Sequence, residues 1–162
     1  MSGMSRLPTL GPRGEGGVLL QGVLLVAIAL CGLLPPAWNG TMARIVSGVA
    51  GAALLAVGGA LAVTGMRDLR ANLTPLPHPR DGATLIETGV YALVRHPIYG
   101  GLVIAAAGWG LLIASVPALV LAAVLLAFFD LKSHREEAWL EERFPDYPAY
   151  RRRTRRLIPF LY

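Results

Sequence analysis

Four apolar runs separated by polar segments constrain this sequence more than any other feature. They cover residues 18–34, 45–64, 98–113 and 117–129. A helix that crosses a bilayer needs about 20 apolar residues, and the first two runs come near that length. Only Ala114, Ser115 and Val116 separate the last two runs, which we therefore expect to form a tight helical hairpin. The sequence predicts an all-α integral membrane helical bundle with about four transmembrane helices.

The composition supports this interpretation. The chain of 162 residues is 54% hydrophobic and 15% charged, whereas a soluble domain carries about a quarter charged residues. We expect a single domain over residues 1–162. It would hold two N-terminal spans in 1–64, a cytosolic loop in 65–97, a helical hairpin in 98–131 and a cytosolic C-terminal segment in 132–162. The single cysteine, Cys31, excludes an internal disulfide and a cysteine-based zinc site.

The basic residues predict the orientation of the spans. Every Lys and Arg except Arg44 lies before the first run, between the second and third, or after the fourth. Because cytoplasmic loops carry an excess of Lys and Arg, we expect a multi-pass protein of the cytoplasmic membrane with both termini in the cytosol. The net charge of +5 then favours contact with anionic membrane lipids. No basic stripe is interleaved with stacking aromatic residues, so nucleic acid is not an expected partner.

A first polar cluster lies where the loop of residues 65–94 runs into the third apolar segment. Pro97 suits the first turn of a helix, and the amides of such a helix start attract a carboxylate or phosphate. Tyr91 and Tyr99 would stack on a flat ring, and His96 lies between them in sequence. The alternative is a plain interfacial belt, because Tyr, Arg and His gather at membrane edges without any ligand. The residues alone leave both interpretations open.

A second polar cluster follows the fourth apolar run. No helix breaker lies between Pro117 and Phe144, so we expect one helix of about 28 residues, roughly 42 Å long. The bilayer core is only about 30 Å thick, and the helix would carry Lys132 and Glu136 out into the cytosol on one face. Solvated Lys–Glu pairs on a surface helix are the alternative. We prefer that alternative for Glu141 and Glu142, and a functional role for Glu136.

Other chemistries find little support in the sequence. The three histidines and the nearby carboxylates do not form a full ligand set, so no metal is expected. The sequence also lacks a nucleotide P-loop, a serine elbow and a G-x-G-x-x-G motif.

The two clusters together match a known pattern. The first reads Gly89-x-Tyr91-x-x-x-Arg95-His96-Pro97-x-Tyr99-x-Gly101, the second reads Glu136-Glu137-x-x-Leu140-x-x-x-Phe144-x-x-Tyr147-x-x-Tyr150, and Pro159 follows. This order, with a helical hairpin between the motifs, resembles the isoprenylcysteine carboxyl methyltransferase and phospholipid methyltransferase-like membrane proteins. The resemblance covers about residues 76–160.

The resemblance implies an S-adenosylmethionine (SAM)-dependent methyltransferase whose cytosolic site receives a lipophilic methyl acceptor from the membrane. It implies cofactor contacts from Ala83, Thr84, Leu85, Ile86, Tyr91, His96, Pro97, Ile98, Tyr99 and Glu136. It further implies catalytic roles for Lys132, at the place that contacts the acceptor, and for Glu136. The sequence departs from the family pattern at Ala83, Lys132 and Pro145, where His, Arg and Gly are expected. Lys lacks the bidentate fork of Arg.

Two other classes share parts of this pattern. NADPH-dependent sterol reductases of membranes carry a related Arg-x-Pro-x-Tyr-x-Gly stretch, but the Glu136-Glu137 pair favours the methyltransferase. A non-enzymatic four-helix scaffold or small transporter is the third hypothesis. Transporters place polar residues or broken helices at the membrane midplane, and none of the four runs contains a charge. The acceptor stays open among prenylated cysteine, phospholipid amine, quinone-like ring, thiol and other lipophiles.

Overall fold

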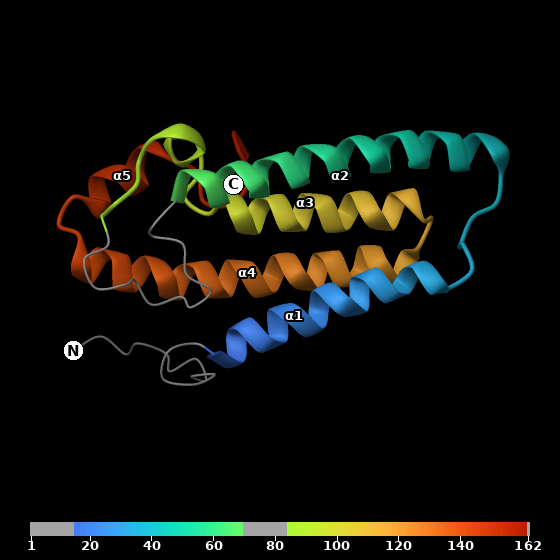
Figure 1. Cartoon of the computed structure of the whole chain (residues 1–162), viewed down its shortest axis with the longest axis horizontal. Helices are drawn as coiled ribbons and strands as arrows, with labels where there is room; N and C mark the ends of the chain where they lie inside the picture. The colour runs from blue at the N-terminus through green and yellow to red at the C-terminus, as the bar shows by residue number, and fades with distance from the viewer. Residues whose placement is uncertain (1–14, 70–83, 162) are drawn as a thin grey trace.

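The chain forms a bundle of four long helices that run alternately in opposite directions (Figure 1). This computed structural model describes residues 15–69 and 84–161. The long helices are α1 (Glu15–Leu30), α2 (Thr41–Leu69), α3 (Pro97–Leu112) and α4 (Val116–Arg143). The short elements are the 3-10 helices η1 (Cys31–Leu33) and η3 (Gly89–Ala92) and the helix α5 (Tyr147–Arg153). The described residues contain no strand, and the prediction of an all-α bundle is confirmed.

Among the described residues, three segments are long and apolar enough to cross a membrane: Glu15–Leu33, Thr41–Leu69 and Val116–Arg143. The fourth long helix, α3, is a shorter apolar helix of 16 residues, which corresponds to about 24 Å. Large apolar side chains point outward from α1 and α2, for example Val23 and Val49, whose exposed fractions are 57% and 68%. Such a surface is that of an integral membrane protein.

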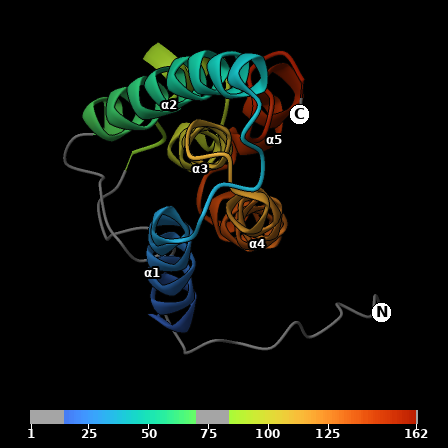
Figure 2. The same cartoon turned by 90° about the vertical axis from the view of Figure 1, so that its right-hand side faces the viewer.

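Helix α3 occupies the centre of the bundle, with α2, α4 and α1 around it (Figure 2). Its contact with α2 is a backbone contact. A Cβ atom added to Gly58 would lie 2.5 Å from the carbonyl oxygen of Gly101, and one added to Gly108 would lie 2.8 Å from the carbonyl oxygen of Gly51. Small residues permit this close approach of membrane helices. The glycine positions therefore fix how α2 and α3 pack.

The hairpin between α3 and α4 confirms the predicted tight turn. Ala114 adopts a positive φ of 54°, and the Ser115 hydroxyl accepts a hydrogen bond from the Ala118 amide at 3.3 Å. This cap satisfies one of the free amides at the start of α4. The Ala114 carbonyl in turn accepts from the Ala37 amide at 2.8 Å, which joins the two loops at this end of the bundle.

The helix boundaries correct the expected ones in two places. Helix α2 continues through residues 65–69, which were expected to begin the loop, because no proline interrupts this stretch. Helix α1 begins at Glu15 and ends at Leu30, so both of its ends lie a few positions before those of the expected run of 18–34. Helix α4 agrees with the expected continuous helix and ends one residue before Phe144.

Candidate functional site

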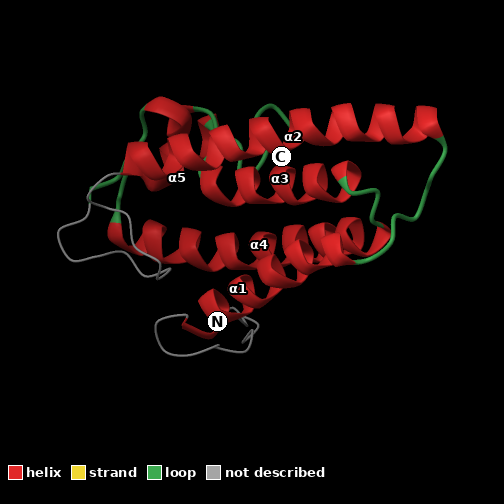
Figure 3. Ribbon diagram, turned by 45° about the vertical axis from the view of Figure 1, so that its right-hand side comes forward, coloured by secondary structure: helices red, strands yellow, loops and turns green. Residues whose placement is uncertain are grey.

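The site lies at the end of the bundle where α3 begins and α4 ends, and where η3 and α5 also gather (Figure 3). These elements meet there because the chain direction alternates from one long helix to the next. The start of α3 therefore lies beside the last turns of α4, and α5 folds back after α4. The two polar clusters of the sequence thus face each other across this end.

Glu136 is held by two residues of the first cluster. The Tyr99 hydroxyl donates a hydrogen bond to Glu136 Oε1 at 2.6 Å, and His96 Nδ1 lies 3.6 Å from Glu136 Oε2. Glu136 and His96 are 9% and 8% exposed. The ring of Tyr99 also stacks on the rings of Phe129 and His96, with centroid distances of 4.3 and 5.5 Å. The carboxylate therefore has a fixed position against an aromatic surface.

Glu137, one residue further along α4, forms an ionic network that shares His96 with Glu136. Arg95 Nε donates to Glu137 Oε1 at 2.8 Å, and His96 Nε2 lies 3.2 Å from the same oxygen. The Arg95 guanidinium also donates to the Thr154 carbonyl at 2.5 Å and to the Arg151 carbonyl at 3.1 Å. Glu137 is 2% exposed. This network joins the loop before α3, the end of α4 and the segment after α5.

Lys132 lies beside the rings of Tyr99 and Phe129. Its ammonium group donates to Gln21 Oε1 of α1 at 2.9 Å and lies 4.8 Å from the ring centroid of Tyr99 and 5.9 Å from that of Phe129. An ammonium over an aromatic face is attracted by the electrons of the ring. Lys132 is 8% exposed, so this cation belongs to the interior of the site.

Tyr91 anchors η3 to the rest of the site. Its hydroxyl donates to the Gly65 carbonyl of α2 at 3.3 Å, and its own carbonyl accepts from the Tyr150 hydroxyl at 2.7 Å. Burial, and after it the negative charges of Asp68 and Glu136, raises the pKa of Tyr91. Burial also raises the pKa of Tyr150. Both phenols therefore stay protonated and keep the hydrogen that they donate.

The start of η3 depends on a glycine. Gly89 has a φ of +62°, a conformation that glycine adopts without strain. Asp68 Oδ2 accepts a hydrogen bond from the Val90 amide at 2.9 Å, and a Cβ at Gly89 would lie 2.1 Å from that same oxygen. The glycine of the Gly-x-Tyr motif therefore allows the end of α2 to hold η3.

The segment after α5 closes over the start of α3. The amides of Arg95 and His96 donate to the carbonyls of Arg155 and Arg156, each at 2.9 Å. The Arg155 amide donates back to the Leu93 carbonyl at 3.1 Å. A Cβ at Gly100 would lie 1.8 Å from the Leu157 carbonyl oxygen. Gly100 therefore gives the returning chain room to lie against α3.

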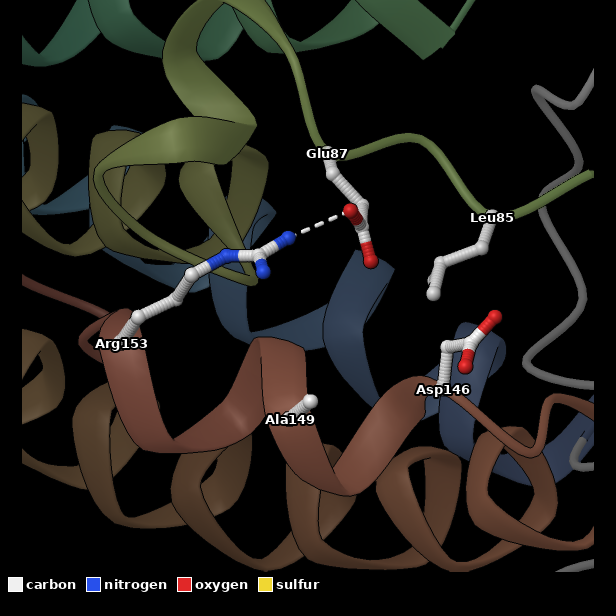
Figure 4. Close-up of a pocket in the computed structure, with 5 residues that line it drawn as sticks. All are labelled: Leu85, Glu87, Asp146, Ala149 and Arg153. Atoms are coloured by element: carbon white, nitrogen blue, oxygen red, sulfur yellow. Dashed lines mark hydrogen bonds and ion pairs between the residues drawn. The ribbon is translucent and has the colours of Figure 1, made fainter.

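The expected cofactor segment of residues 83–86 lies partly within the described structure. Ala83 falls outside the described residues, Thr84 is exposed, and Leu85 and Ile86 are half-buried. Leu85 lines a cavity of about 390 Å³ together with Glu87, Asp146, Ala149 and Arg153 (Figure 4). Arg153 and Glu87 form an ion pair at its edge. The lining of this cavity does not include His96, Tyr99 or Glu136.

Pro97 and Ile98 take a packing role. A Cβ at Gly65 would lie 2.9 Å from Pro97 Cγ and 3.1 Å from Ile98 Cγ1, so both side chains pack on α2. Of the expected site residues, the structure thus brings His96, Tyr99, Lys132 and Glu136 into contact. Tyr91 lies beside them.

Three residues of the site were not among the site residues predicted from the sequence: Arg95, Glu137 and Gln21. Arg95 and Glu137 lie inside the two sequence motifs, and that position could have identified them as site residues. Gln21 carried a weaker signal, because it interrupts the apolar run of α1. Within the described ranges, no group of three or more His, Cys, Asp or Glu residues could hold a metal ion.

Comparison with known proteins adds two findings. The phospholipid methyltransferase family matches residues 46–147 of the chain. A curated protein of Schizosaccharomyces pombe named Protein-S-isoprenylcysteine O-methyltransferase is 39% identical over 79 residues, which are 48% of this chain and 34% of that protein. The chain therefore matches about a third of the length of this curated relative.

Proposed function

Because the chain belongs to the phospholipid methyltransferase family, we propose that it is an S-adenosylmethionine-dependent membrane methyltransferase that acts on a lipophilic acceptor. The observation that carries this proposal is the contact between Tyr99 and Glu136. It joins the two family motifs into one buried site at one end of an apolar bundle. The name of the yeast relative, an O-methyltransferase of protein S-isoprenylcysteine, supports an acceptor with an apolar chain.

The chemistry of the site residues fits this cofactor. SAM is a cation with an ammonium group and a sulfonium, and it carries hydroxyl groups on its ribose. A buried carboxylate accepts strong hydrogen bonds from charged donors, and aromatic faces attract cations. Glu136 provides the buried carboxylate, and the rings of Tyr99 and Phe129 provide the aromatic faces. The cavity lined by Leu85 falls within the usual size of ligand pockets, about 300–1,000 Å³, and supports a contribution from Leu85.

Each residue would then have a distinct task. Glu136 would accept a hydrogen bond from the cofactor, with Tyr99 and His96 fixing its carboxylate. Lys132 would orient the polar head of the acceptor, because its ammonium lies within 4.8 Å of the centroid of the Tyr99 ring that contacts Glu136. When bound, SAM supplies an electrophilic methyl group. Transfer of that methyl group would form a bond from the acceptor atom to the methyl carbon as the carbon–sulfur bond breaks, with the neutral thioether S-adenosylhomocysteine as the leaving group. Such a transfer needs alignment of two reactants, and alignment alone lowers such barriers substantially.

The orientation of the site follows from the charge distribution. The described basic residues at this end include Arg143 and the arginines of α5. The positive-inside rule therefore supports a site on the cytosolic side and termini in the cytosol. SAM would reach the site from the cytosol and the acceptor from the bilayer.

Two measurements test the proposed function. The purified protein is incubated with methyl-labelled SAM and a membrane lipid extract, and mass spectrometry then identifies labelled lipids. In parallel, thermal unfolding in detergent is followed with SAM or with NADPH. SAM at 100 times its dissociation constant stabilises by about 2.7 kcal/mol. Stabilisation by NADPH alone would contradict the methyltransferase and favour a reductase.

A further inference from the structure

Gln21 is a polar side chain in an otherwise apolar helix. From Gly16 to Leu30, all residues of α1 except Gln21 are glycine or apolar. Its partner across the helix interface is Lys132 of α4, at 2.9 Å. The family match begins at residue 46, so α1 lies outside it and nothing in that match assigns a role to Gln21.

The Lys132 ammonium has more donors than the protein uses. An ammonium carries three N–H groups, and in the described part of the chain Gln21 Oε1 is its hydrogen-bond acceptor. The rings of Tyr99 and Phe129 lie near it. Glu136, one helical turn along α4, attracts the ammonium electrostatically, but in the described part of the chain the two form no direct ion pair. The ammonium therefore keeps N–H groups that an oxygen anion can accept from.

The Gln21 amide is oriented by the same contact. Because an ammonium only donates, the amide oxygen faces Lys132 and the amide nitrogen, Nε2, faces away from it. Among the described residues, Nε2 donates to no protein atom, and Gln21 is only half-buried. The pair therefore presents two neighbouring sets of free N–H donors, one on each helix.

We propose that Gln21 is a specificity-determining residue, and that its amide nitrogen and the Lys132 ammonium together bind an anionic head group with two oxygens, a carboxylate or a phosphate, on an apolar chain. This inference rests on the proposed function, whose acceptor it describes. Two donors on separate helices match two oxygens of one head group. The outward apolar side chains of α1 near this pair, such as Leu20 and Val23, provide a surface for the apolar chain.

The test uses simple amphiphiles of equal chain length with the whole protein. Decanoate and decyl phosphate carry the two-oxygen anion, and decanol carries one neutral oxygen. We expect one or both anions, and not decanol, to raise the unfolding temperature of the wild-type protein in detergent. Comparison of the two anions then separates the carboxylate from the phosphate.

The Gln21→Glu variant distinguishes recognition from a structural role. A glutamate still accepts from Lys132, so the protein should fold with an unchanged or higher unfolding temperature. It lacks the amide donor and adds a negative charge beside Lys132, and the apparent affinity for the anions should fall by about tenfold or more. Gln21→Met removes the amide donor without adding a charge and should lower the affinity as well. If Lys132 alone bound the anion, Gln21→Met would leave the affinity unchanged or raise it, which would contradict the role of Gln21. Thr64→Val, which replaces by a methyl group the hydroxyl that donates to the Ala60 carbonyl in α2, should bind the anions like the wild type.

Two further results would overturn this inference. One is a folded Gln21→Glu protein that binds decanoate and decyl phosphate as tightly as the wild type. The other is a wild-type protein stabilised by SAM but by neither anion, which would leave the proposed function standing. Absence of stabilisation by SAM, with intact binding of an anion, would instead count against the methyltransferase and leave the anion site in place.

Discussion

The Tyr99 hydroxyl donates to Glu136 across 2.6 Å, although the two residues lie 37 positions apart in the chain. This hydrogen bond joins the first turn of α3 to the later turns of α4. The stacking of Tyr99 on Phe129 adds a second contact between the same helices. A buried hydrogen bond to a charged group is stronger than one between neutral groups. The pair therefore fixes both the helix packing and the position of the carboxylate.

Substitution of Glu136 tests the proposed cofactor contact. Glu136→Gln keeps the shape of the side chain and removes its charge. A hydrogen bond to a charged group contributes about 1.5–3 kcal/mol, so we expect SAM affinity to fall by about 10- to 150-fold. A titration in detergent measures it. Glu142→Gln changes an exposed residue of the same helix and should alter affinity by less than about twofold. Unchanged affinity in folded Glu136→Gln would exclude this role.

Glu137 should matter for stability more than its exposed neighbour Glu141. Glu137→Gln leaves the Arg95 guanidinium without its carboxylate partner, and breaking such a buried pair costs about 3–5 kcal/mol. The unfolding temperature should fall by about 6 °C or more. Glu141→Gln removes an exposed pair with Arg151, worth about 1 kcal/mol or less. Equal unfolding temperatures of the two variants would show that the Arg95–Glu137 pair does not stabilise the fold.

Adjacent glycines of α2 offer a matched test of the packing against α3. In Gly58→Ala the new Cβ would lie 2.5 Å from backbone atoms of α3, so the helices must separate and the protein should be destabilised. In Gly59→Ala the new Cβ meets no atom within 4 Å. Alanine is a better helix former than glycine, so this variant should unfold at the wild-type temperature or above. A reversed order of the two unfolding temperatures would contradict the packing described.

Cysteine labelling tests the proposed orientation. In a Cys31→Ala background, Asn39→Cys lies in the loop between α1 and α2, and Glu142→Cys lies near the end of α4; both positions are exposed. A membrane-impermeant thiol reagent added to intact cells should label the first variant alone. Permeabilised cells should show labelling of both. Labelling of Glu142→Cys in intact cells would place the site on the outer side.

The helices could be predicted from the sequence because their signals are local. Apolar length predicts the spans, and the absence of a breaker before Phe144 predicts the extent of α4. The end of α2 was placed too early, because Arg67 and Asp68 look like loop residues although both are helical. The Asp68 carboxylate accepts a hydrogen bond from the Val90 amide. This contact joins residues 22 positions apart and depends on tertiary structure.

The site was predictable only where it coincided with a motif. His96, Tyr99 and Glu136 lie in the two motifs, and Lys132 lies one helical turn before the second motif; the structure brings the four together. The pairing of Gln21 with Lys132 joins residues 111 positions apart. No periodicity within one helix encodes which residue of another helix lies opposite. The cofactor roles of these residues stay predictions until binding is measured.

The return of the chain over Gly100 has a consequence for biosynthesis. The carbonyls of Arg155 and Arg156 complete the hydrogen bonding of the Arg95 and His96 amides, and both residues are synthesised after α3 and α4. A nascent chain that has inserted all four long helices therefore still lacks the covering of its own site. We expect ligand binding to begin only once residues 154–157 have left the ribosome and packed against α3, so that insertion into the membrane precedes competence to bind.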